Sequence, residues 1–206
     1  MGDGFFDHIY DAETPEEVQG VYDRFARDYD AAVTENGYAT PARLAAMLSA
    51  KLPDMRDKPL LDFGCGTGLS GLALAAEGFA VIDGCDPSQA MIDQSRERGV
   101  YRHLWSYPLA QPPDPKDLAE YPVFAAVGVV SVGAAPPDVL AYLIGALTKG
   151  SHLIFSYNSH TLEDETYMDA LAAAKTDTSL KLLAEESGPH LPALGLTSTI
   201  YLFQRQ

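Results

Sequence analysis

The chain has 206 residues, of which 47% are hydrophobic, and its 29 acidic residues against 14 basic ones give a formal net charge of −15. This length suffices for one domain with a substantial core, no apolar run approaches the ~20 residues of a membrane helix, and so acidic a surface repels a phosphate backbone. The acidic segment Met1–His8 lacks the basic and apolar regions of a secretory signal, and the two cysteines, Cys65 and Cys85, form neither a disulfide framework nor a zinc motif. We therefore expect a cytoplasmic protein without metal, membrane or nucleic-acid partners.

Two helices are predicted before the first strand. In residues Thr14–Tyr29, a threonine can cap the helix, a proline occupies the first helical position, and Glu17 completes a capping box. A second helix begins at Thr40 and ends before Pro53. We expect residues 14–53 to form a helical cap on an α/β core of residues 58–206, within a single domain.

Strands and helices alternate through most of that core. The predicted strands are Pro59–Phe63, Phe79–Cys85, Tyr101–Trp105, Pro122–Val130 and Ser151–Tyr157. The predicted helices are Leu69–Glu77, Ser88–Arg98, Asp138–Thr148 and Leu162–Lys175. Such alternation predicts a parallel sheet with helices on both faces.

The last two predicted strands, Ser179–Glu186 and Leu196–Phe203, have only a turn-rich segment between them, so they should pair antiparallel. The prediction is a Rossmann-like, open, seven-stranded α/β sheet that is mostly parallel, with an antiparallel C-terminal end and two N-terminal helices.

A glycine-rich turn follows the first predicted strand. It contains Gly64, Gly66 and Gly68, and Asp86 ends the next strand. Ligands of open α/β sheets bind at the carboxyl ends of the strands, where glycines permit close approach and a carboxylate can accept from ribose hydroxyls. Chance glycines in an ordinary turn are a minor alternative.

Two cofactor classes compete for this arrangement. The spacing Gly66–Gly68–Gly71 matches a dinucleotide fingerprint, but the frame directly after the strand begins at Gly64. Asp62, two residues earlier, would repel a pyrophosphate and attract the ammonium group of a methionine-like moiety. The charge of Asp62 therefore favours S-adenosylmethionine over a nicotinamide dinucleotide.

The sequence also resembles a known family. Leu61–Gly68 is similar to the first motif of class I S-adenosylmethionine-dependent methyltransferases, and Val81–Ser88, followed by Met91, is similar to the second. Tyr22–Asp30 resembles an N-terminal segment of the small-molecule branch, and the likeness is strongest to methyltransferase-like proteins of the Williams–Beuren region type. It covers about residues 18–203.

The resemblance implies roles at matching positions. The glycines would line the methionine part of the cofactor, Asp62 would lie near its amino group, Asp86 would hold the ribose, and the end of the fourth strand would hold the amino group through backbone. Tyr22 or Tyr29 would reach the cofactor carboxylate, with core packing as the alternative. The implied cofactor-binding residues are Tyr22, Tyr29, Asp62, Gly64, Cys65, Gly66, Thr67, Gly68, Asp86, Pro87, Ser88, Met91, Ser106, Leu109 and Gly128.

One position departs from the family pattern. Where the family places an aspartate that accepts from the adenine amino group, this chain has Pro108, which has no side-chain acceptor. Adenine could then be held by Ser106, by backbone at Leu109, or by contact with Trp105 or Tyr107.

Methyl transfer from a sulfonium is an in-line displacement, in which positioning matters most and a base is optional. The candidates after the fourth and fifth strands are Ser131, Asn158, His160 and Glu163, and none is assigned a catalytic role. Val130–Gly133 lacks the Asn/Asp-Pro-Pro-aromatic motif of the family's nucleic-acid and amide-directed branches, which favours a small-molecule acceptor.

Three hypotheses follow. They are a small-molecule methyltransferase, a protein that binds S-adenosylmethionine or S-adenosylhomocysteine without transferase activity, and, least favoured, an NAD(P)-dependent oxidoreductase. The acceptor and the oligomeric state stay open.

Overall fold

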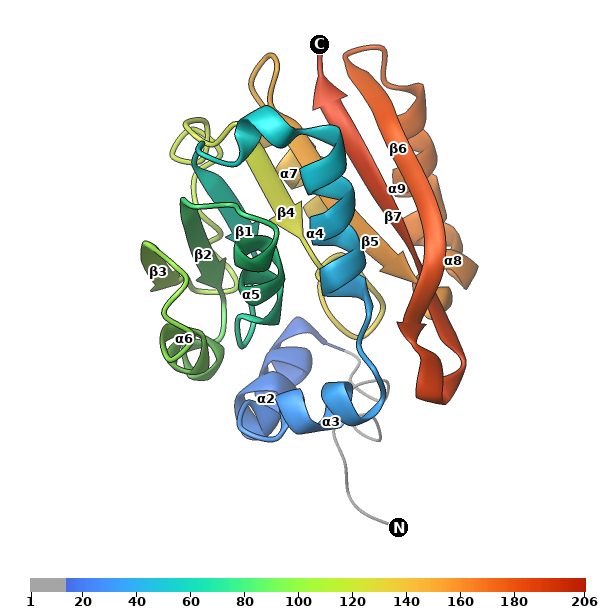
Figure 1. The fold of residues 1–206 in the computed structure, drawn as a ribbon. Coiled ribbons are helices and arrows are strands. Elements are labelled where there is room, and N and C mark those ends of the chain that lie inside the picture. The colour runs from blue at the N-terminus through green and yellow to red at the C-terminus, as the bar shows by residue number, and fades with distance from the viewer. Residues whose placement is uncertain (1–13) are drawn as a thin grey trace.

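The computed structural model describes residues 14–206, so the prediction for Met1–His8 lies outside the described residues. Seven strands form one sheet in the order β3-β2-β1-β4-β5-β7-β6 (Figure 1). The strands are β1 (Leu60–Phe63), β2 (Ile82–Asp86), β3 (His103–Ser106), β4 (Val123–Ala126), β5 (His152–Asn158), β6 (Leu180–Leu191) and β7 (Leu196–Arg205). The first five run parallel, and β7 pairs antiparallel with both β5 and β6. The predicted fold class is confirmed.

Helices cover both faces of this sheet. They are α2 (Pro15–Phe25), α3 (Tyr29–Glu35), α4 (Thr40–Lys51), α5 (Leu69–Ala76), α6 (Gln89–Arg96), α7 (Asp138–Ala146), α8 (Ser159–Glu163) and α9 (Glu165–Thr176), with short 3-10 turns at Pro53–Met55 and Pro192–Leu194. In Figure 1, α4 and α5 lie in front of the sheet, α7 and α9 lie behind it, and α2 and α3 lie beyond the carboxyl ends of the parallel strands. Within residues 14–206, the longest apolar helices fall short of what a membrane crossing requires.

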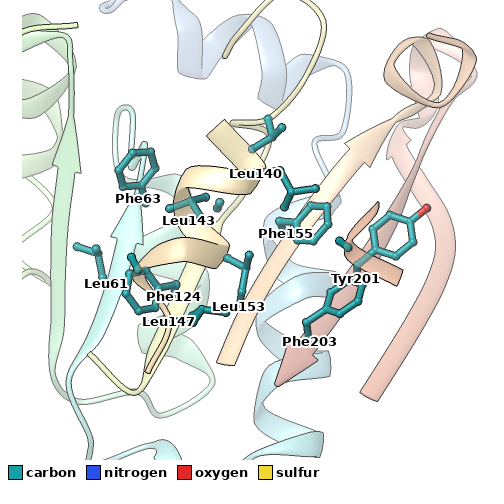
Figure 2. Close-up of a cluster of buried hydrophobic side chains, with 14 of the residues drawn as sticks. Leu61, Phe63, Phe124, Leu140, Leu143, Leu147, Leu153, Phe155, Tyr201 and Phe203 are labelled. Atoms are coloured by element: carbon teal, nitrogen blue, oxygen red, sulfur yellow. The ribbon is translucent and has the colours of Figure 1, made fainter. Parts of the chain in front are cut away.

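Alternation along β1 divides the core into two layers. Leu61 and Phe63 point to the α7 face, where they join the larger apolar cluster (Figure 2). Leu60 points to the opposite face and packs in the cluster that contains the apolar side of α4. Because side chains alternate along a strand, Asp62 shares the face of Leu60, and its carboxyl group is fully buried beside an apolar layer.

Two predicted helices are each divided in the structure. The prediction of one helix over Thr14–Tyr29 is wrong: its capping box forms, but α2 ends at Phe25 and α3 begins at Tyr29. This bend lets both helices pack around Val21. The prediction of one helix over Leu162–Lys175 is also wrong, because Asp164 leaves the helical conformation and caps α9.

Two strand predictions also need correction. The apolar run Pro122–Val130 forms a strand only to Ala126, since the backbone turns at Gly128, where φ is 69°. Conversely, β6 continues through the segment predicted as a turn to Leu191. It is an edge strand, where a bulge next to Pro189 accommodates the missing N–H, and the turn itself forms at residues 192–195.

Candidate cofactor site

A pocket of about 450 Å³ lies at the carboxyl ends of β1, β2 and β4. Its volume is in the range of small-molecule and cofactor sites. The predicted site residues that line it are Tyr22, Tyr29, Gly64, Gly66, Asp86, Pro87, Ser88, Met91, Leu109 and Gly128. The topology thus brings residues from α2, the glycine turn, β2, α6 and the turn after β4 into one cavity.

The glycine turn needs glycine for two different reasons. Gly64, Gly66 and Gly68 have φ values of 69°, 53° and 89°, a region that favours glycine over other residues. At Gly64 a Cβ atom would lie only 2.5 Å from a methyl group of Val129, so the turn packs directly against the segment after β4. At Gly66 nothing lies within 4 Å of such an atom, and this glycine faces the pocket.

Asp86 joins the glycine turn to the start of α6. One carboxylate oxygen accepts from the backbone N–H of Gly66 at 2.9 Å, and the other accepts from the N–H of Ser88 at 2.9 Å. Burial, and secondarily repulsion from Asp23, raises the pKa of Asp86 to about 6. Each oxygen keeps a lone pair, so the carboxylate can still accept from two neighbouring hydroxyl groups of a ligand.

Asp62 lies beneath this turn and is absent from the pocket wall. The hydroxyl groups of Ser70 and Tyr101 donate to one carboxylate oxygen at 2.6 and 2.7 Å, and the other oxygen is buried without a hydrogen-bond partner. Burial raises the pKa of Asp62 to about 6, with a further contribution from Asp86. Its charge acts on the pocket from behind the glycine turn.

Four other predicted residues lie around the pocket but do not line it. Cys65 and Thr67 are buried within the turn, and Gly68 is the N-cap residue that precedes α5. The exposed hydroxyl of Ser106 donates to the side-chain oxygen of Gln89 at 2.6 Å, and Ser106 does not line the pocket. Leu109 and Tyr107 line the pocket, whereas Trp105 does not.

Carboxylates of the N-terminal cap contact the loops that build the site, which the sequence reasoning did not identify. Asp23 accepts a hydrogen bond from the Ser88 hydroxyl. Asp30 accepts from the Thr67 hydroxyl at 2.5 Å and also pairs with Arg98. The resemblance of Tyr22–Asp30 to the family was the one signal of such a role.

Two further contacts hold α2 over the pocket. The side-chain amide of Gln19 donates to the carbonyl of Pro87 at 3.1 Å, and the Tyr22 hydroxyl donates to the carbonyl of Gly133 at 3.3 Å. The rings of Tyr22 and Tyr29 lie 6.0 Å apart, and both line the pocket. The cap therefore supplies one aromatic wall.

A second group of aromatic side chains also lines the pocket. Phe63 lies 5.8 Å from the ring of Tyr107 and 5.8 Å from that of Tyr142, and all three line the pocket. Among the described lining residues the charged side chains are Asp86 and Asp138, with no lysine, arginine or histidine. The cavity thus suits an uncharged or cationic ligand better than an anionic one.

Two of the candidate bases, Asn158 and Ser131, join loops outside the pocket. The side-chain amide of Asn158 donates to the Ser131 hydroxyl at 3.0 Å, and its oxygen caps α8 by accepting from Thr161 N at 2.9 Å. Neither these residues nor His160 and Glu163 line the pocket. Residues 14–206 also contain no group of three His, Cys, Asp or Glu side chains that could hold a metal ion.

Known proteins resemble the chain in sequence and in fold. Residues 60–113 match the family model described as a methyltransferase domain. Methyltransferase-like protein 27 of Homo sapiens is 33% identical over 74% of the chain and 62% of its own length. A ribosomal protein L11 methyltransferase of Serratia proteamaculans is 37% identical over 48% of the chain and 33% of its own length.

A solved structure shares the fold at low identity. It is a SAM-dependent methyltransferase from Thiobacillus denitrificans in complex with S-adenosyl-L-homocysteine, with a TM-score of 0.57 and 15% identity over 87% of this chain and 98% of that one. The chain spans less than two thirds of the length of the two curated relatives. The family model, the curated relatives and this solved structure are all methyltransferases by name, so the chain is similar to methyltransferases in part of its sequence and in its fold.

Proposed function

We propose that this chain transfers the methyl group of S-adenosylmethionine to a small acceptor that is uncharged or cationic. The observation that carries the proposal is the pocket at the carboxyl ends of β1, β2 and β4, which combines the glycine turn with the carboxylate of Asp86 and lacks basic lining residues among those described. We further propose that residues 1–206 act as one domain in the cytoplasm, which suits two free, buried cysteines.

The residues present fit this cofactor better than a dinucleotide. The buried, unpartnered oxygen of Asp62 and the carboxylate of Asp86 give this end of the sheet negative charge. Such charge opposes a pyrophosphate and favours an ammonium and a sulfonium group. When bound, S-adenosylmethionine supplies a methyl group already activated by the positive sulfur.

In this proposal each part of the pocket has a task. Asp86 accepts from the ribose hydroxyls, while the backbone around Gly64 and Gly128 accommodates the amino-acid end. Tyr107 and Leu109 border the adenine. The aromatic wall of Tyr22 and Tyr29 excludes water from the acceptor and helps to orient it.

The acceptor class follows from the same walls. Aromatic rings and carboxylates favour a flat, neutral or positively charged compound, and they disfavour phosphate esters. A short cap of two helices over a cavity of about 450 Å³ suits a small molecule. The names of some relatives refer to a ribosomal protein or a tRNA, so the labelling experiment below also examines protein and nucleic-acid acceptors.

The second candidate is a cofactor-binding protein without transferase activity. Asn158 and Ser131 are engaged in loop contacts, and no lining histidine or lysine is available among the described residues to take up a proton. This arrangement is compatible with an acceptor that needs no base, and equally with a protein that only binds.

Two measurements separate these functions. Calorimetry should detect binding of S-adenosylmethionine and S-adenosylhomocysteine but not of NAD(H), and binding of NAD alone would overturn the cofactor assignment. Incubation with a methyl-labelled donor and a fractionated cell extract should then label a compound that anion-exchange resin does not retain. Label in tRNA or protein would refute the acceptor class, and cofactor binding without any transfer would favour the second candidate.

A further inference from the structure

Tyr38, in the segment between α3 and α4, lies against the backbone that ends β4. A Cβ atom at Gly128 would lie 2.9 Å from the Tyr38 hydroxyl oxygen. Gly128 has a φ of 69°, its N–H donates to the Ser156 hydroxyl at 3.0 Å, and it lines the pocket. The missing side chain at Gly128 is therefore what makes room for the tyrosine hydroxyl.

The ring of Tyr38 packs against His190. It meets the ring of His190 edge-on, with centroids 5.3 Å apart and an interplanar angle of 89°. His190 is fixed in turn, because its Nδ1 lies 2.8 Å from the Thr40 hydroxyl, which lies 2.8 Å from that of Ser198. Burial chiefly lowers the pKa of His190 to about 4, so this support is uncharged at neutral pH.

The Tyr38 hydroxyl also faces charge at this end of the pocket. Burial raises its pKa, and Tyr22 and Asp62 raise it further, so the group stays a protonated donor. Asp62 has one buried carboxylate oxygen without a partner. The Tyr38 hydroxyl therefore lies against the turn at Gly128 as a donor, within the electrostatic influence of the buried carboxylate of Asp62.

We propose that Tyr38 is a positioning residue for the amino-acid end of the cofactor, acting through the backbone turn at Gly128. Its hydroxyl, wedged against Gly128, fixes the direction of the Gly128 and Val129 peptide groups that face the pocket. The negative charge of Asp62 draws the ammonium group to the same place. This inference rests on the proposed function, since it assigns one part of S-adenosylmethionine to one part of the site.

The test compares two ligands that differ only at that end. S-adenosylhomocysteine carries the amino-acid group, whereas 5′-methylthioadenosine keeps the adenine, ribose and thioether without it. In calorimetry, Tyr38→Phe should lower the affinity for S-adenosylhomocysteine about tenfold, which is the scale of one misplaced hydrogen bond. The affinity for 5′-methylthioadenosine should change by less than about twofold. Tyr157→Phe is the matched control, because it removes a tyrosine hydroxyl that is buried without a hydrogen-bond partner and does not line the pocket.

A second variant tests the contact itself. Gly128→Ala places a methyl group against the Tyr38 hydroxyl, and adding Tyr38→Phe removes that collision. The combined loss of S-adenosylhomocysteine affinity should therefore be clearly smaller than the product of the two single losses. If Tyr38→Phe does not fold, Gly128→Ala alone decides: selective loss of S-adenosylhomocysteine supports the inference, and equal loss of both ligands overturns it.

Three results would overturn the positioning role while the proposed function stands. In the first, the wild type binds S-adenosylhomocysteine and Tyr38→Phe binds it with the same affinity. In the second, Tyr38→Phe loses affinity for S-adenosylhomocysteine and 5′-methylthioadenosine equally. In the third, the loss of affinity in the double variant equals the product of the losses in Tyr38→Phe and Gly128→Ala. A wild type that binds neither S-adenosylmethionine nor S-adenosylhomocysteine would refute the proposed function itself.

Discussion

Replacing Asp62 by asparagine tests whether a buried carboxylate is retained beneath the pocket at the expense of stability. The side chain is 0% exposed, and one of its oxygens has no hydrogen-bond partner. Burial raises its pKa from 3.8 to about 6. Asparagine has nearly the same size and carries no charge, so it removes the titration while it fills the same space.

The sign and size of the change in the free energy of unfolding with pH follow from proton linkage. Because the folded protein binds this proton more tightly than the unfolded chain, the associated stability is complete below the unfolded pKa and is lost as pH rises through the folded pKa. A shift of about two pKa units corresponds to about 3 kcal/mol in full, and about 2 kcal/mol of it falls between about pH 4.5 and about pH 7.5. The free energy of unfolding of Asp62→Asn, relative to wild type, should therefore rise by about 2 kcal/mol over that interval.

Urea unfolding of both ligand-free proteins at the two pH values measures this difference. Any constant effect of the amide, such as an unpaired N–H, cancels between the two conditions. We also expect the variant to bind S-adenosylhomocysteine more weakly, because an amide does not attract the ammonium group. A relative stability that does not change with pH would refute the idea that Asp62 is a strained buried carboxylate.

Asp83→Asn is the matched control on the neighbouring strand. Burial alone would raise the pKa of Asp83, but hydrogen bonds from Arg102 and Tyr121 and the Arg102 charge lower it below its usual value. The stability from Asp83 is therefore present above the unfolded pKa and is lost as pH falls. Because the pKa of Asp83 is lowered from 3.8, the relative stability of Asp83→Asn should stay nearly constant between about pH 4.5 and about pH 7.5, where that of Asp62→Asn changes, and should rise only as pH falls below about 4.

Three further predictions concern the site and its cap. Asp86→Ala should weaken S-adenosylhomocysteine binding by at least ~1 kcal/mol in calorimetry, and an unchanged affinity in a folded variant would contradict the ribose role. Gly64→Ala should lower the melting temperature more than Gly66→Ala, because both have positive φ but only at Gly64 would the new atom lie 2.5 Å from a neighbouring side chain; equal melting temperatures would argue against tight packing there. Asp30→Ala removes the hydrogen-bond acceptor of Thr67 and the ion-pair partner of Arg98, so limited proteolysis should cleave residues 14–53 faster than in the wild type. An unchanged cleavage rate would show that these contacts do not hold the cap.

The parts of the fold that sequence reasoning predicted depend on local signals. The capping box at Thr14 forms, and the glycine turn follows β1 as expected. Each of these signals involves residues a few positions apart, so propensity and spacing are enough to predict it. The parallel direction of the first five strands followed from their alternation with helices.

The errors arose where long-range packing decides the local structure. Periodicity alone continues a helix through Phe25 and Asp164, whereas the structure bends at both positions. At the first, two helices share the cluster around Val21, and at the second a carboxylate caps a new helix. The full length of β6 was missed because a proline such as Pro189 usually ends a strand. Proline is tolerated here because β6 lies at the edge of the sheet.

In the candidate site too, residues set by local spacing were predicted and residues set by long-range contacts were missed. Asp86 and the glycines were predicted because strand–turn–helix spacing places such residues at the end of a sheet, and the structure lines the pocket with them. Asp23 and Asp30 were missed because their partners are 65 and 37 residues away in sequence. A surface carboxylate on a helix carries no local sign of the loop that it will contact.

Glycine at the end of an apolar run is the one local signal that could have pointed to Tyr38. A glycine at such a place indicates that another group approaches the backbone closely, although it does not say which group. The run Pro122–Val130 contains Gly128, and the approaching group is a hydroxyl from a residue 90 positions earlier. The ring that carries it is supported by His190, 62 positions beyond Gly128, so three distant segments must fold together before this end of the pocket takes its shape. Recognising such an arrangement requires the fold itself, and for that reason the variants at Gly128 and Tyr38 are informative about the site as a whole.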